Sequence, residues 1–185
     1  MWMTEWTGPR DLPKKIKSPI THSLGQMVGR FKAMHGGASV IMHFELGHPE
    51  YYSAGIFKAN WKKPWKRDTP YYVWQQMVNQ TPHGDKAWMV ESSVPKGSKD
   101  WRDRVTAYTN TKKRRTTVHI VNNTDSPVKK VNVTLSRKRL KSVIAFRTSE
   151  KENHIQLSKD AVKIDADGVS LDLPQYSFVT LQIKH

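Results

Sequence analysis

Two carboxylate side chains, Glu5 and Glu45, stand near the ends of two short apolar segments of this sequence. The first segment spans residues 2–6, the second spans residues 38–45, and a strong helical pattern lies between them. A separation of about 40 residues fits two neighbouring parallel strands joined by one helix. Both carboxylates then face one edge, and His43 alternates with Glu45 along its strand. His43 and Glu45 are candidates to hydrogen-bond a substrate or to orient Glu5, although the residues by themselves favour ordinary polar pairing at a strand end.

Aromatic residues accompany these carboxylates. Trp6 ends the first segment, and Trp61 and Trp65 stand among four Lys and one Arg within residues 58–67. Indole rings offer a large apolar face, which suits the C–H face of a sugar ring, and the cations suit an anionic sugar. The sequence therefore makes Trp6, Trp61 and Trp65 candidates for polysaccharide binding. Packing of the loop against the rest of the protein is the alternative for Trp61 and Trp65.

The sequence lacks the residues that several other kinds of functional site require. The chain has no Cys, which removes disulfides, thiolate zinc sites and cysteine nucleophiles. No metal-ligand spacing such as His-Glu-x-x-His occurs, and neither a phosphate-binding loop nor a dinucleotide fingerprint is present. We therefore expect no metal and no cofactor. Surface or capping positions are expected for the remaining histidines, which are His22, His35, His48, His83, His119, His154 and His185.

The elements that would position these residues can be predicted from apolar spacing. Ser18-Pro19 starts a helical pattern over residues 19–35, and Gly36-Gly37 ends it. Thr69-Pro70 starts a second helix that ends before Pro82, and residues 46–68 between the second strand and this helix are predicted to form a loop. The order strand, helix, strand, loop, helix is the repeating unit of a parallel α/β fold.

The pattern changes after Gly84. Short strand candidates separated by turn residues follow one another to the end of the sequence, which is typical of an antiparallel sandwich of about eight strands. They cover residues 87–94, 103–110, 116–122, 128–135, 140–147, 161–165, 169–173 and 176–183. The sequence thus predicts a mixed α+β chain with two parts, residues 1–85 and residues 86–185.

The first part is too small to be stable by itself. Two strand–helix units leave a two-stranded parallel sheet with open edges, whereas a complete (β/α)8 barrel takes about 250 residues. We therefore interpret residues 1–85 as the last quarter of such a barrel, equivalent to strands seven and eight. The rest would come from elsewhere, so a homo-oligomer or a missing barrel chain is an expected partner.

The charge is strongly basic. Thirty-one Lys and Arg against 16 Asp and Glu give a net charge of +15, which favours anionic partners. The run at residues 112–115 has Thr and Asn neighbours rather than interleaved aromatics, so we expect a solvated hairpin turn and not a nucleic-acid groove. No apolar run long enough to span a membrane occurs, and residues 1–6 lack the features of a signal peptide.

Three segments resemble the clan-A retaining glycoside hydrolases. WMTEW at residues 2–6 resembles the end of their seventh barrel strand, where a Glu is the nucleophile. AGIFKANWKKPWKRDTPYYVWQQM at residues 54–77 resembles their eighth loop and helix, and LDLPQYSFVTLQI at residues 171–183 resembles the closing strand of the sandwich that follows the barrel. Agarase-like and xylosidase/iduronidase-like enzymes are the subgroups that the segments bring to mind.

The resemblance implies a role for Glu5 as nucleophile, a polysaccharide substrate, and a secreted or periplasmic location. One departure matters: the family carries its general acid/base on an Asn-Glu pair, and this sequence has none. Because retaining hydrolysis needs two carboxylates about 5–5.5 Å apart, the chain alone is expected to be inactive. A non-catalytic carbohydrate-binding or interaction module is the alternative function, and a nucleic-acid-binding protein is the second alternative.

Overall fold

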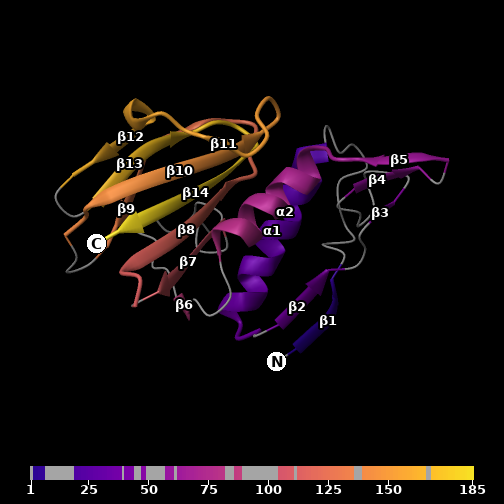
Figure 1. The fold of residues 1–185 in the computed structure, drawn as a ribbon, viewed down its shortest axis with the longest axis horizontal. Helices are drawn as coiled ribbons and strands as arrows, with labels where there is room; N and C mark the ends of the chain where they lie inside the picture. The colour runs from indigo at the N-terminus through magenta and orange to yellow at the C-terminus, as the bar shows by residue number, and fades with distance from the viewer. Residues whose placement is uncertain are drawn as a thin grey trace.

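The computed structural model arranges two helices beside a β-sandwich, with a small parallel sheet and a short three-stranded sheet on the far side of the helices (Figure 1). The helices lie between these small sheets and the sandwich. The structure describes residues 2–6, 19–38, 40–43, 47–48, 57–60, 62–81, 86–88, 104–110, 112–135, 139–165 and 168–185.

Both helices follow the predicted pattern. Helix α1 spans Pro19–His35 and helix α2 spans Thr69–Gln80. Asp68 caps α2, because its Oδ1 accepts the backbone N–H of Thr69 at 2.8 Å. The chain leaves α1 through Gly37, whose φ of 90° lies in the left-handed region that glycine tolerates. The predicted helix over residues 19–35 is confirmed at both ends.

Two small sheets accompany the helices. Strand β1 (Trp2–Trp6) pairs in parallel with β2 (Val40–His43), as the sequence predicts. Strands β3 (Gly47–His48), β4 (Phe57–Asn60) and β5 (Lys63–Lys66) form a three-stranded sheet in that order. The prediction of a loop over residues 46–68 is therefore wrong for these strands. Strands of two to four residues are shorter than the window in which apolar alternation becomes visible.

The larger part is built from two antiparallel sheets. One has the order β11-β10-β14-β8-β7-β6, and the other has the order β12-β13-β9. A 3-10 turn at Lys159–Ala161 precedes β12. The bounds are β6 (Lys86–Trp88), β7 (Val105–Asn110), β8 (Arg115–Asn122), β9 (Val128–Thr134), β10 (Ser142–Ser149), β11 (Ile155–Gln156), β12 (Val162–Ile164), β13 (Gly168–Leu173) and β14 (Ser177–Lys184).

The central strands of the six-stranded sheet are covered on both faces. Alternate residues of β8 and β14, among them Ile120 and Leu181, pack against the sheet β12-β13-β9 in one apolar core. The intervening residues Val121 and Phe178 face the helices and join a second core with residues such as Phe31. The helices are thus fixed to the sandwich by an apolar core and by buried polar side chains on the same face of the sheet. Neither helix is long and apolar enough to cross a membrane, within the part of the chain that the structure describes.

Candidate functional site

The carboxyl ends of β1 and β2 form one edge of the parallel pair. Glu5 and Trp6 are the last residues of β1, and Trp6 is the register partner of His43, the last residue of β2. The structure therefore brings Glu5, Trp6 and His43 to the same edge, as the spacing predicts. Glu45 and Trp61 lie outside the described residues.

The β4–β5 hairpin carries the remaining candidate. Trp65 lies on β5 with 40% of its surface exposed. Lys66, the next residue, is the register partner of Lys58 on β4. The Arg67 guanidinium lies 5.1 Å from the ring centre of Tyr71 in the first turn of α2, which ties the hairpin to that helix. Trp65 thus combines an accessible ring with neighbouring positive charge.

His119 occupies a buried position that its sequence context did not predict. It lies on β8 with no exposed surface, and its ring stacks on Phe178 with the ring centres 5.5 Å apart. Its Nδ1 hydrogen-bonds Thr180 Oγ1 at 2.8 Å, and its Nε2 hydrogen-bonds the hydroxyl of Thr81. Burial lowers the pKa of His119 to about 3. The expectation of a surface or capping role is wrong here, because the helices cover this face of the sheet.

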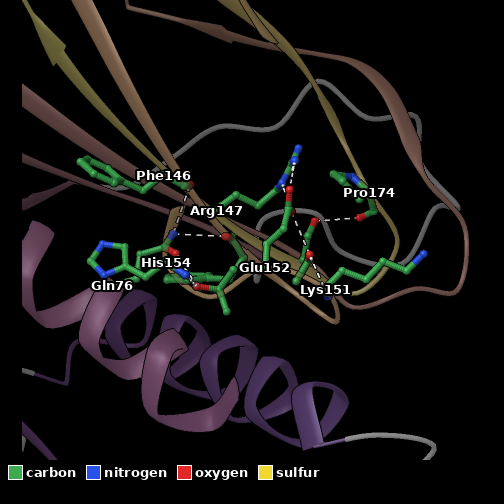
Figure 2. A network of polar contacts seen from close by, with 11 residues as sticks. Gln76, Phe146, Arg147, Lys151, Glu152, His154 and Pro174 are labelled. Atoms are coloured by element: carbon green, nitrogen blue, oxygen red, sulfur yellow. Dashed lines mark hydrogen bonds and ion pairs between the residues drawn. The ribbon is translucent and has the colours of Figure 1, made fainter. Parts of the chain in front are cut away.

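Gln76 links helix α2 to two strands beneath it, β10 and β14 (Figure 2). Its side-chain amide donates to the Phe178 carbonyl oxygen at 3.1 Å and to Thr180 Oγ1 at 2.9 Å. Its amide oxygen accepts the Thr148 hydroxyl at 2.7 Å. Gln76 is fully buried, so these contacts satisfy polar groups that water cannot reach. Gln76 and His119 meet through the shared Thr180 hydroxyl.

Ionisable side chains at the end of β10 and in the turn that follows it adjoin this network, because the His154 backbone N–H donates to Thr148 Oγ1 at 3.0 Å. Arg147 donates through Nε and Nη2 to the two carboxylate oxygens of Glu152, and Ser149 Oγ donates to Glu152 Oε2 at 2.9 Å (Figure 2). The hydrogen bond from Arg147 holds the pKa of Glu152 below its ordinary value. Nε2 of His154 lies 3.2 Å from the Gln80 amide nitrogen, and burial lowers the pKa of His154. These side chains close the turn and connect it to helix α2.

The residues that the structure describes contain no group of three or more His, Cys, Asp or Glu placed to hold a metal ion. At the described end of the parallel pair stand an acidic residue, Glu5, an aromatic residue, Trp6, and a histidine, His43. The roles of Gln76 and His119 were not predicted. A glutamine on a helix and a histidine in a strand that also carries Arg, Thr and Asn look the same in the sequence whether they face a buried network or solvent.

Solved structures share this fold. A family 30 subfamily 8 xylanase from Clostridium acetobutylicum matches with a TM-score of 0.68 and 16% identity over 100% of this chain and 42% of its own. A conserved exported protein from Bacteroides fragilis matches with 0.69 and 11% identity over 98% and 38%. A family 51 arabinofuranosidase from Xanthomonas axonopodis pv. citri matches with 0.61 and 13% identity over 98% and 40%. No protein-family profile matches the sequence, and no curated protein does.

The chain thus spans less than half the length of these structures. Its mixed α+β architecture corresponds to a barrel end followed by a β-sandwich in family 30 and family 51 glycoside hydrolases. That part of the sequence-based prediction is confirmed. The agarase-like and xylosidase/iduronidase-like subgroups and the division at residue 85 stay predictions.

Proposed function

We propose that this chain is the nucleophile-bearing end of a retaining glycoside hydrolase that acts on polysaccharide. The observation that carries the proposal is the parallel β1–β2 pair, which sets Glu5 at the carboxyl end of a strand and Trp6 beside His43. In (β/α)8 barrels the catalytic residues sit at the carboxyl ends of the strands. The match to the barrel end and sandwich of a xylanase supports the same placement.

Glu5 would form a bond from its carboxylate oxygen to the anomeric carbon while the glycosidic carbon–oxygen bond breaks. The leaving oxygen takes a proton from a second carboxyl group, which the 185 residues do not supply as an Asn-Glu pair. Water then attacks the anomeric carbon, gives its proton to that second group, and releases Glu5. His43 and Glu45 would orient Glu5 or bind sugar hydroxyls, and Trp6 would stack on the sugar.

The test is complementation. This chain is mixed with the part of the Clostridium acetobutylicum xylanase that it does not match, and reducing-sugar release from xylan is measured. Activity is expected from the mixture but not from either part alone. Glu5→Gln should abolish it, because no covalent intermediate can form, and Glu45→Gln should reduce it less.

Two results would overturn the proposal. If Glu5→Gln leaves the restored rate unchanged while Glu45→Gln abolishes it, Glu5 is not the nucleophile. If no complex forms, the barrel-end interpretation loses its support and the non-catalytic alternative takes its place. That alternative is favoured by the β4–β5 hairpin, where the exposed ring of Trp65 stands beside Lys66 and Arg67 and would hold an anionic sugar chain.

A further inference from the structure

Three basic segments that are far apart in the sequence meet at one end of the sandwich. The turn between β7 and β8 contributes exposed side chains at residues 112–114, and β8 begins with Arg115. The segment before β10 contributes Arg139 and Lys141, and β14 ends with Lys184. We call this surface the cationic end, and it consists of Lys112, Lys113, Arg114, Arg115, Arg139, Lys141 and Lys184.

Backbone pairing fixes the segments of the cationic end side by side. Lys184 is the register partner of Arg115 on one side and of Ser142 on the other. The backbone N–H of Lys141 donates to the Lys184 carbonyl oxygen at 2.8 Å, and that of His185 donates to the Arg114 carbonyl oxygen at 3.1 Å. Because neighbouring strands lie about 4.8 Å apart, the cations form a row across the strand ends.

The β7–β8 turn is itself held in one conformation. Asn110 Oδ1 accepts the backbone N–H of Lys113 at 3.0 Å, and Arg114 adopts a left-handed φ of 47°. The Arg114 carbonyl oxygen also accepts Nδ1–H of His185 at 2.8 Å. The turn therefore presents its charges from a defined backbone rather than from a loose loop.

Positive charge is concentrated at the cationic end. Arg115 and Lys184 are register partners on adjacent strands, with the exposed residues 112–114 beside them. Within the described residues, segments 112–116, 139–144 and 182–185 contain no Asp or Glu. Other exposed lysines differ: Lys151 has Glu150 and Glu152 as neighbours, and Lys159 precedes Asp160. A bound polyanion would complement the positive charge of the cationic end.

We propose that the cationic end is a docking surface for a linear anionic polysaccharide, separate from the edge that carries Glu5. This inference rests on the proposed polysaccharide function. In the described segments of the surface the one ring is the imidazole of His185, which donates to the Arg114 carbonyl oxygen, so stacking of successive unpaired bases has no row of aromatic platforms there. Regular cations across successive strands match a polymer with a charge on each sugar. Figure 1 shows the C-terminus, beside the end of β14, on the opposite side of the molecule from β5.

The test measures binding of polygalacturonate, with neutral dextran as the uncharged control. Affinity for polygalacturonate should fall steeply as salt rises, because binding releases counterions. The triple variant Lys112→Gln, Lys113→Gln, Arg114→Asn should bind about tenfold more weakly at low salt. Asn is used at position 114 because it tolerates the left-handed conformation.

A matched variant removes the same charge elsewhere: Lys129→Gln, Lys130→Asn, Lys151→Gln. It should retain affinity within about twofold, since these exposed lysines follow the start of β9 and the end of β10, at the opposite end of the sandwich. If both triple variants lose affinity for polygalacturonate equally, net charge alone governs binding, and the proposal is overturned. Tighter binding of duplex DNA than of polygalacturonate, lost in the first variant, would assign the surface to nucleic acid instead. Glu5→Gln should bind polygalacturonate as tightly as the unmodified chain does. The binding measurement therefore tests the cationic end independently of the hydrolase proposal.

Discussion

The buried imidazole of His119 has a hydrogen-bond partner for each of its ring nitrogens. Its ring is buried among aromatic side chains and its two nitrogens hydrogen-bond hydroxyl groups of Thr81 and Thr180. Thr180 accepts from Gln76, which leaves its own proton to donate to Nδ1 of His119. His119 can then carry its proton on Nε2 and donate to Thr81, so the neutral ring is fully satisfied. Protonation would break this arrangement inside an apolar layer.

The burial of His119 predicts acid-sensitive stability. In the unfolded chain the ring takes up a proton below about pH 6.5, whereas the folded pKa is about 3. The contribution of His119 is therefore complete above pH 6.5 and falls as the pH drops toward 3, by about 1.4 kcal/mol per pH unit. Urea unfolding at pH 7, 5.5 and 4.5 measures it, and His119→Gln should show a flatter pH dependence than the unmodified chain.

The control for this prediction is His154→Gln. Burial also lowers the pKa of His154, but its ring is only half-buried at the turn after β10. Its replacement should flatten the pH dependence less than that of His119. Parallel curves for His119→Gln and the unmodified chain would mean that the ring is protonated in the folded state.

At the scale of elements, local signals specify the helices and many of the strands. Ser18-Pro19, Gly36-Gly37 and Thr69-Pro70 are caps and stops whose effect is local, and α1 and α2 begin where these signals place them. Strands β3 and β11 have two residues each and are defined by hydrogen bonds to their partner strands. Two residues are too few for an apolar alternation that could predict a strand. The second apolar core could not be predicted either, because it joins residues from both halves of the chain.

The docking of α2 gives a second prediction. Gln76→Leu should destabilise the protein by about 3 kcal/mol, because the Thr180 and Thr148 hydroxyls and two strand carbonyls lose a buried partner. Gln75→Leu is the matched change on the same helix. Its side chain makes only 3.4 Å contacts with Tyr71 and His154, so its loss should cost less than about 1 kcal/mol. Urea unfolding at pH 7 measures both, and equal losses would show that Gln76 is not what docks the helix.

At the scale of the whole molecule, the sequence shows where the charged runs are along the chain, but it does not predict which of them lie close together in space. Residues 112–114 form the solvated turn that the sequence predicts, whereas Arg115 begins β8. Their proximity to Lys141 and Lys184 depends on which strands are neighbours. The same holds for the candidate site. Glu5 and His43 could be assigned to one edge because parallel strands bring their carboxyl ends together, and this pairing is observed. The contacts of Glu45 and Trp61 stay predictions.

The parallel pair leads to the last prediction, which concerns association. Among the described strands, β1 and β2 pair only with each other, so each presents an edge that no described strand covers. Open edges template pairing with further chains. The 185-residue polypeptide is therefore expected to form dimers or larger assemblies at tens of micromolar, measured by light scattering and sedimentation. Met3→Lys, which puts a charge on β1, should shift it toward the monomer. Ile164→Lys, at a half-exposed position on the edge strand β12, should not. A monomeric mass of 21.4 kDa with a cooperative melt would contradict the prediction, and equal effects of the two lysines would place the contact away from β1.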